Sequence, residues 1–260
     1  MKLADLKQCK QRGEKITCLT AYDASLAKLM DNCDIDLILV GDSLGMVVQG
    51  EKSTRTVRVS EMVYHTKAVA KVCDRALVIA DMPYQSYERP SMALENAKLL
   101  VDAGAQVVKL EGGVERQKVV ETLIENGIAV CAHLGLQPQK VNKASDYKVQ
   151  GKDLDGAKTI VEDALLLESL GVSALVLECV PRSLAKLVSE KLSIPTIGIG
   201  AGKDCDGQVL VCYDMLGITQ GKLPRFVRDF TADNSSIPMA IKAFARAVKN
   251  QSFPSEKESY

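Results

Sequence analysis

Residues 107–112, VVKLEG, decide the fold of this chain. The run is short, mostly apolar and closed by a glycine, which is typical of a strand buried on both faces of a parallel sheet. The same pattern recurs along the chain, and each run is bounded by glycine, proline or polar residues. The other runs cover residues 16–22, 37–41, 76–81, 129–135, 174–180, 196–202 and 208–213. The chain therefore carries eight predicted strands.

Segments with helical periodicity separate these strands. The segment 91–103 has Ser91 at its predicted N-cap and is followed by Gly104. A glycine directly after the last helical residue is a stop signal, and two further predicted helices end in the same way. The predicted helices between strands cover residues 25–33, 60–73, 91–103, 114–126, 155–170 and 182–192.

Strands that alternate with helices over about 250 residues favour an α/β fold, a single-domain (β/α)8 TIM barrel spanning residues 1–260. An open doubly wound sheet is the alternative. Its dinucleotide-binding form requires G-x-G-x-x-G after the first strand, where this chain has TAYDAS instead. We also expect an N-terminal helix within residues 1–15 outside the barrel, a C-terminal amphipathic helix over 237–250 and a flexible tail over 251–260.

The composition excludes several classes of protein. The chain has 33 basic and 33 acidic residues, whereas a nucleic-acid-binding protein usually has a basic surplus. No apolar run approaches the roughly 18 residues of a membrane span. The charged N-terminus lacks the apolar core of a signal peptide, so we expect a cytoplasmic protein. The eight cysteines form no CxxC pair and mostly lie in apolar runs, which predicts buried thiols rather than disulfides or zinc ligands.

Carboxylates end or follow three consecutive predicted strands. In a barrel these ends form the mouth that carries the active site, so Asp42, Asp81 and Glu111 are expected to be neighbours. Carboxylates that close repel each other unless a cation joins them, and an all-oxygen set suits Mg²⁺. For either Asp taken alone, a helix N-cap or a surface loop is the alternative.

Two basic side chains are predicted to face the same mouth. Lys109 lies two residues before Glu111, so both point to one side of the strand. A lysine there is either a Schiff-base nucleophile or a clamp on a substrate carboxylate; the carboxylate neighbours favour the clamp, with a core ion pair as the alternative. His133 has either a site role or a structural role, and His65, in a predicted helix, is assigned none.

Two further features complete the predicted mouth. Glu178 ends a strand made of Leu, Val and Cys, and such surroundings raise the pKa of a carboxylate, as suits a general base. A buried partner for Lys or Arg is the alternative. The glycine-rich stretch 196–207, TIGIGAGKDCDG, fits a phosphate site at the end of the seventh strand, but a tight turn explains it equally well.

Long motifs resemble the ketopantoate hydroxymethyltransferase (3-methyl-2-oxobutanoate hydroxymethyltransferase) family. The resemblance runs from about residue 3 to about residue 250, and its motifs occur in the family's order. In place of a glycine pair before the YKVQG motif this chain has Ser145-Asp146, which leaves the conformation of the 140–150 loop open. The motifs include KITCLTAYD, LVGDSLGMVVQG, ADMPY, VVKLEGG, AHLGLQPQ, YKVQG, LVLECVP and IGIGAG.

The resemblance implies an enzyme of pantothenate biosynthesis built on a (β/α)8 barrel. The enzyme transfers a hydroxymethyl group from 5,10-methylenetetrahydrofolate to 3-methyl-2-oxobutanoate and forms 2-dehydropantoate. It implies a homo-oligomer, a decamer of two stacked pentamers with the C-terminal helix at subunit contacts. By the same resemblance the Mg²⁺ ligands are Asp42 and Asp81 with Glu111 as a further ligand, direct or through water. The oxo acid contacts Asp42, Ser43, Asp81 and Lys109, with His133 in the site and Glu178 as the proton acceptor.

The expected chemistry passes through an enolate of the oxo acid. Mg²⁺ held by the keto and carboxylate oxygens stabilises the enolate, Glu178 removes the C3 proton, and the carbon attacks the one-carbon unit. The alternative enzyme is another Mg²⁺-dependent 2-oxo acid lyase or mutase of the same barrel type. A barrel that only binds metal or serves assembly is the non-catalytic alternative.

Overall fold

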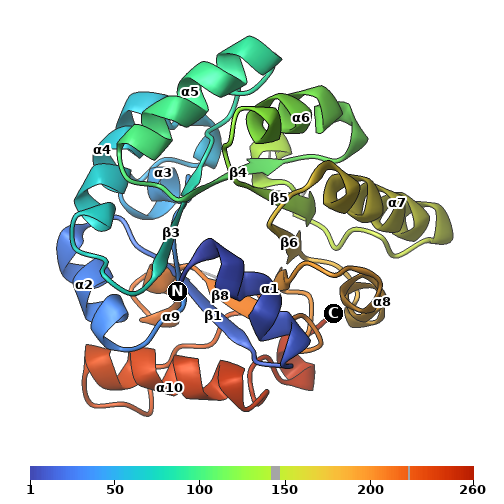
Figure 1. The fold of residues 1–260 in the computed structure, drawn as a ribbon. Coiled ribbons are helices and arrows are strands. Elements are labelled where there is room, and N and C mark those ends of the chain that lie inside the picture. Colours follow the sequence, from blue (N-terminus) through green and yellow to red (C-terminus); the bar gives the residue numbers. More distant parts are fainter. Residues whose placement is uncertain (142–146, 222) are drawn as a thin grey trace.

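Eight parallel strands close into a barrel in chain order, and β8 returns to pair with β1 (Figure 1). The computed structural model describes residues 1–141, 147–221 and 223–260. The predicted (β/α)8 class is confirmed, and a closed sheet excludes the doubly wound alternative. Each predicted run contains most or all of one strand. The strands are β1 (Ile16–Thr20), β2 (Leu37–Val40), β3 (Leu77–Asp81), β4 (Val107–Glu111), β5 (Val130–Gly135), β6 (Ala174–Glu178), β7 (Thr196–Ile199) and β8 (Gly207–Leu210).

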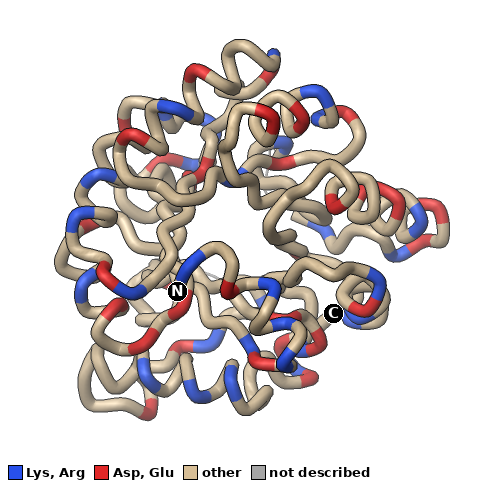
Figure 2. The backbone as a smooth tube through the Cα atoms, viewed as in Figure 1, with Lys and Arg blue, Asp and Glu red and all other residues tan. Residues whose placement is uncertain are grey.

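Helices surround the barrel, and most of them connect consecutive strands (Figure 1). Charges of both signs are scattered over these outer helices, in agreement with the equal numbers of acidic and basic residues (Figure 2). Two one-turn helices, α3 and α9, follow strands and lack the length for a periodic pattern. The helices are α1 (Leu3–Gln11), α2 (Ala24–Asn32), α3 (Leu44–Val47), α4 (Val59–Ala70), α5 (Pro90–Asp102), α6 (Gln117–Glu125), α7 (Leu154–Leu170), α8 (Arg182–Lys191), α9 (Cys212–Met215) and α10 (Ile237–Lys249).

The ends of these helices follow local chemistry, with one correction to the prediction. Helix α5 begins at Pro90, one residue before the predicted cap Ser91, and its N-cap is Arg89. Proline suits the first helical position because its φ is fixed and its missing N–H would have had no partner there. The predicted glycine stop at the end of α7 is confirmed, since Gly171 has φ 97° in the left-handed region.

Helix α1 lies across the end of the barrel where the strands begin. Its buried Leu6 and Cys9 join the first residues of several strands, including Ile16 and Leu37, in one apolar cluster inside the barrel. Lys10 fastens the helix by donating to Oδ2 of Asp206 at 2.8 Å. The predicted helix therefore lies outside the strands and closes the end of the barrel opposite the mouth.

The C-terminal segment packs against the barrel, although we expected a flexible tail. Phe253 is 2% exposed, and its ring lies 5.5 Å from Phe230 and 5.9 Å from Phe244 of α10. The tail then reaches α8 (Figure 1), where the Arg182 amide donates to the Tyr260 carbonyl at 2.9 Å. The buried ring of Phe253, the ion pair of Arg228 with Glu258 and the Tyr260 contact hold the tail in place. The polar composition of the segment gave no sign of these contacts.

The cysteines and the helices bear on two sequence expectations. All eight cysteines lie in the described ranges and are free; Cys73 is half-buried and the others are buried, as predicted. Within the described part of the chain, no helix is both long enough and apolar enough to cross a membrane. The predicted departure at Ser145-Asp146 lies outside the described residues.

Candidate active site

Strands β2 to β6 bring the predicted site residues to one end of the barrel. Asp42 and Ser43 follow β2, and the other residues lie on or at the end of their strands. The pairing register places Asp81 beside Lys109, and Glu111 beside His133. Glu178 ends β6 opposite Gly135 of β5. The alternation of side chains along each strand sends these polar groups inward above the apolar interior.

Asp42 and Asp81 form a buried pair of carboxylates. The Asp42 amide donates to Oδ2 of Asp81 at 2.9 Å, which fixes the end of β2 against the end of β3. Burial raises the pKa of Asp42 to about 7, and the negative charge of Asp81 adds to the increase. A carboxylate in this state is stabilised by any cation placed beside it, so the pair has the electrostatics of a cation site.

Lys109 is the buried cation of the site. Its ammonium lies 2.9 Å from Oδ1 of Asp81. Burial alone lowers the pKa of Lys109, but the nearby carboxylates Asp81 and Glu111 outweigh burial and hold that pKa above its usual value. The lysine is therefore protonated at neutral pH, which suits a charge clamp and does not suit a Schiff-base nucleophile.

His133 lies between the lysine and two glutamates. Burial and the charge of Lys109 lower its pKa well below the usual value, so the ring is neutral. Nδ1 lies 3.3 Å from the Lys109 ammonium, which can only donate, and the network therefore assigns the proton to Nε2. Nε2 lies 3.3 Å from Oε2 of Glu178, without hydrogen-bond geometry. The structure thus places His133 beside Lys109 and Glu178, and its role in the site stays a prediction.

Glu178 is the carboxylate that reaches furthest towards solvent. Its side chain is 13% exposed, compared with 3% for Glu111 and 4% for Asp81. Burial raises the pKa of Glu178 to about 8, and Lys109 only partly opposes this effect. The carboxylate thus combines access to a bound substrate with a pKa near neutrality, the two properties of a general base.

Ser43 lies at the edge of this group. Its hydroxyl is 2.8 Å from the hydroxyl of Tyr22, and the Tyr22 carbonyl in turn lies 2.6 Å from Nδ1 of His65. His65, to which the sequence assigned no role, is therefore connected to Ser43 indirectly, through Tyr22. Nothing in the periodicity of its helix distinguishes this histidine.

Sequence reasoning missed Gln139 and Tyr87. Gln139 is 3% exposed, and its amide donates to Oδ2 of Asp42 at 2.8 Å. Tyr87 is 2% exposed, and its hydroxyl contacts Gln139 and accepts from the Glu111 amide at 3.3 Å. Tyr87 lies in a turn and Gln139 in a single 3-10 turn, and both segments are too short for a periodic pattern to indicate burial. The only sequence signal was the place of Gln139 within the motif AHLGLQPQ.

The donor set fits Mg²⁺ better than a metal that needs a complete protein cage. No group of three or more His, Cys, Asp or Glu side chains among the described residues is arranged to hold one ion. Mg²⁺ is usually bound by one or two carboxylates and keeps water and substrate oxygens as its other ligands. Asp42 and Asp81 supply such a pair of carboxylates, held in place by Gln139, which donates to Oδ2 of Asp42, and by Lys109 and the Asp42 amide, which contact Asp81.

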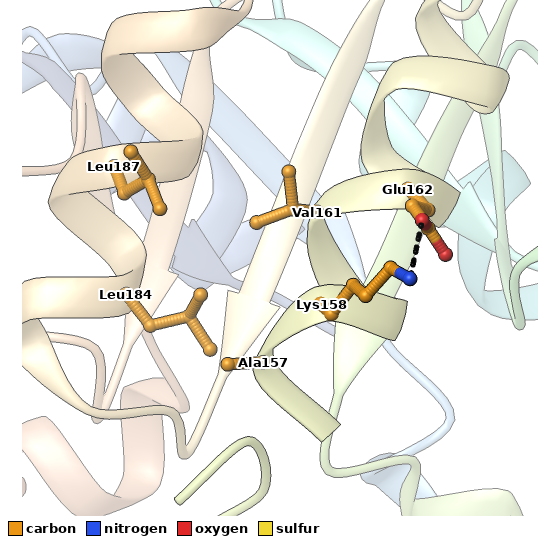
Figure 3. Close-up of a pocket in the computed structure, with 6 residues that line it drawn as sticks. All are labelled: Ala157, Lys158, Val161, Glu162, Leu184 and Leu187. Carbon is orange, nitrogen blue, oxygen red and sulfur yellow. Dashed lines mark ion pairs between the residues drawn. The ribbon is translucent and has the colours of Figure 1, made fainter. Parts of the chain in front are cut away.

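Two other features lack the chemistry of an active site. In the glycine-rich stretch, a Cβ on Gly200 would lie 2.7 Å from the ring of Phe226, so close packing and a turn with φ 61° account for this glycine. A cleft of about 300 Å³ lies between α7 and α8, where Leu184 and Leu187 face Val161 (Figure 3). The Lys158–Glu162 ion pair, 3.7 Å long, borders the cleft, which is lined by side chains of the two helices and by none of the predicted site residues (Figure 3).

Solved structures share the barrel at low sequence identity. A putative phosphonomutase from Burkholderia cenocepacia J2315 is 14% identical, with a TM-score of 0.65 over 84% of this chain and 95% of that one. A 2,3-dimethylmalate lyase, described as a member of the PEP mutase/isocitrate lyase superfamily, is 15% identical, with a TM-score of 0.58 over 83% and 82%. These likenesses show the fold alone.

Curated sequences are far more similar. The 3-methyl-2-oxobutanoate hydroxymethyltransferase of Vesicomyosocius okutanii is 58% identical over the whole of both chains. The protein of the same name from Methylococcus capsulatus is 52% identical over 99% of this chain and 96% of its own. The family model for ketopantoate hydroxymethyltransferase matches residues 1–256. The chain therefore belongs to the ketopantoate hydroxymethyltransferase family and is a one-carbon transferase of the hydroxymethyl type.

Proposed function

We propose that this protein transfers a hydroxymethyl group from 5,10-methylenetetrahydrofolate to 3-methyl-2-oxobutanoate and forms 2-dehydropantoate for pantothenate biosynthesis. The names of the curated relatives support the acceptor. One structural observation carries the proposal: Glu178, whose pKa burial raises to about 8, stands at the accessible edge of a cluster with a fixed cation and paired carboxylates. This combination suits removal of a weakly acidic proton next to a ketone.

Glu178 would take the proton from C3 of the oxo acid. A base with a pKa near the working pH is both ionised in part and strong enough to accept the proton. Asp42 and Asp81, with Glu111 as a further ligand, would hold Mg²⁺, which when bound would supply positive charge to stabilise negative charge on the keto oxygen of the oxo acid. The C3 carbon would then bond to the methylene carbon of the folate. The two bonds of that carbon to folate nitrogens would break, water would supply the hydroxyl group, and tetrahydrofolate would leave.

Lys109 would bind the carboxylate of the oxo acid as a charge clamp. Asp81 contacts the Lys109 ammonium through one carboxylate oxygen and the Asp42 amide through the other. These two contacts hold Lys109, Asp42 and Asp81 in one arrangement. We expect Lys109→Ala to raise the KM for the oxo acid more than the KM for the folate. Trapping of a substrate adduct on Lys109 with borohydride would overturn the clamp and support a Schiff base.

The experiment that tests the function is exchange of the C3 hydrogen of 3-methyl-2-oxobutanoate in deuterated water, followed by NMR. Wild-type protein with Mg²⁺ should catalyse exchange and should form 2-dehydropantoate when methylenetetrahydrofolate is added. Glu178→Gln should still bind Mg²⁺ and the oxo acid but exchange at least ~10²-fold more slowly.

Three outcomes would contradict parts of this proposal. Wild-type protein that neither exchanges the hydrogen nor forms product would sink the proposed reaction. Exchange by Glu178→Gln at the wild-type rate would move the base elsewhere, with His133 the next candidate. Cleavage of a 2-oxo acid in place of hydroxymethyl transfer would favour a Mg²⁺-dependent lyase of the same barrel type.

A further inference from the structure

Gln139 connects the ends of three strands although it belongs to none of them. It lies in the single-turn 3-10 helix Pro138–Lys140, after β5. Its amide nitrogen donates to Oδ2 of Asp42 at 2.8 Å and to the Met82 carbonyl at 3.0 Å. Its backbone N–H donates to Oε2 of Glu111 at 3.1 Å. Gln139 thus hydrogen-bonds to both Asp42 and Glu111, two of the three carboxylates proposed to bind Mg²⁺.

The orientation of the Gln139 side chain is fixed by its partners. The Met82 carbonyl can only accept, so the amide nitrogen must face it and the amide oxygen must face Tyr87. Tyr87 therefore donates to Gln139 and is free to accept from the Glu111 amide at 3.3 Å. Only an amide side chain serves here, because a carboxylate could not donate to Asp42 and a hydrocarbon could neither donate nor accept.

The loop that carries Gln139 is built on the backbone of Glu178. The Leu136 amide donates to the Glu178 carbonyl at 2.8 Å. Gly135, one residue earlier, passes so close that a Cβ there would lie 2.2 Å from the same oxygen. These contacts fix the position of Gln139 relative to Glu178, and its own hydrogen bonds fix its position relative to Asp42 and Glu111.

We propose that Gln139 is a positioning residue that holds Asp42 and Glu111 at the separation needed to bind a divalent cation. Its side chain fixes the first carboxylate, its backbone fixes the second, and Tyr87 locks the orientation of its amide. The inference rests on the proposed Mg²⁺-dependent function and adds a residue that touches neither substrate nor metal. Groups that orient metal ligands typically change metal affinity by about 10–100-fold when they are removed.

The test measures cation affinity directly. Mn²⁺ is titrated into the full-length protein and followed by water proton relaxation, and Mg²⁺ is then added as a competitor. Gln139→Met keeps the length of the side chain, removes the side-chain hydrogen bonds to Asp42, Met82 and Tyr87, and leaves the backbone hydrogen bond to Glu111 in place. It should weaken Mn²⁺ binding by about 10-fold or more. Tyr87→Phe leaves the amide in place but frees its orientation, and it should weaken binding by a smaller factor.

A matched control is available on the outside of the barrel. The amide of Gln117 donates to the Glu121 carboxylate at 2.8 Å within α6, the same type and length of contact as Gln139 to Asp42. Gln117→Met should leave Mn²⁺ affinity unchanged. Thermal unfolding of each variant without metal separates a loss of fold from a loss of ligand geometry, and the KM for the oxo acid should rise in Gln139→Met as affinity for the cation falls.

The outcomes distinguish this inference from the proposed function. Wild-type protein that binds Mn²⁺, together with a folded Gln139→Met that binds it within twofold of wild type, would overturn the positioning role alone. If Gln139→Met does not fold, unchanged affinity in Tyr87→Phe would overturn it in the same way. Wild-type protein that binds neither Mn²⁺ nor Mg²⁺ would overturn the metal-dependent function and the inference together.

Discussion

Gly135 and Glu178 meet where β5 and β6 end, and their contact leaves no room for a side chain. Gly135 has φ 92°, a conformation that residues with a Cβ rarely adopt, and the Glu178 carbonyl lies where that Cβ would be. The residue after the glutamate, Cys179, also has a positive φ of 47°. The strained backbone of Cys179 and the close approach of Gly135 indicate that the backbone here is arranged to aim Glu178.

We predict that Gly135→Ala lowers the free energy of unfolding by about 3 kcal/mol, because a left-handed backbone and a clash add together. C3-hydrogen exchange should fall at least ~10-fold, since the loop and Glu178 must shift apart. Urea denaturation and NMR exchange measure the two effects. Gly127→Ala is the control: Gly127 has φ 76°, and a Cβ there would meet nothing within 4 Å, so only about 1 kcal/mol should be lost.

The raised pKa of Glu178 predicts the direction of the pH dependence. The base must be ionised to accept a proton, so exchange should increase as pH rises towards about 8. Bound Mg²⁺ adds positive charge and lowers the midpoint, which should therefore lie at or below that value. A pH profile of C3-hydrogen exchange checks this; an exchange rate that falls across pH 6–8 would contradict the role of Glu178.

Glu178 should also make the stability of the fold depend on pH: stability should fall as pH rises, whereas the exchange rate should increase. Its pKa is raised in the folded protein, so the stabilising contribution is full below the unfolded-state value near 4.5 and is lost as pH rises through about 8. Between these limits the loss is at most roughly 1.4 kcal/mol per pH unit. Glu178→Gln should reduce this slope without abolishing it, because Asp42, whose pKa burial raises to about 7, still contributes in the same direction. Urea denaturation of both proteins at pH 5 and pH 8 measures the difference.

At the scale of elements, the strands could be predicted from continuous apolar runs. A strand buried on both faces is apolar at every position, so its run stands out from the polar segments around it. Asp42, Asp81, Glu111 and Glu178 could be placed near the mouth from the sequence because each ends or directly follows a predicted strand, although an N-cap, a loop or an ion pair remained an alternative for single residues. Gln139 and Tyr87 could not be placed there, because loop residues become buried through tertiary contacts that no local pattern records. The start of α5 was missed by one residue, where proline chemistry prevailed over a serine cap.

Helix α1 should stabilise the whole barrel through one side chain. Leu6 is 1% exposed and belongs to the interior apolar cluster, whereas Leu3 on the same helix is 37% exposed. We predict that Leu6→Ala lowers the free energy of unfolding by about 2–4 kcal/mol, through lost burial and a residual cavity. Leu3→Ala should change it by less than about 0.5 kcal/mol. Equal effects of the two substitutions, measured by urea denaturation, would show that α1 does not seal the barrel.

For the molecule as a whole, cation binding should appear as added stability. Mg²⁺ at about 100 times its Kd adds about 2.7 kcal/mol to the folded state, because only that state brings Asp42 and Asp81 together. The Tm should therefore rise by several degrees with Mg²⁺ and return after EDTA. Asp81→Ala should fold but lose this response, as differential scanning calorimetry can show. A response that survives in Asp81→Ala would place the cation elsewhere.

The pairing of β1 with β8 has a consequence for synthesis on the ribosome. Ile16 pairs with Gly207, so the first strand to leave the exit tunnel lacks one neighbour until the last strand has been translated. Through most of translation the growing sheet has two open edges, and the strand ends that form the site are not yet held in a ring. A nascent chain stalled before residue 207 should therefore be digested by protease at β1, and the chain released with β8 complete should resist. The active site should therefore reach its catalytic geometry only when β8 pairs with β1 and the barrel closes, late in translation.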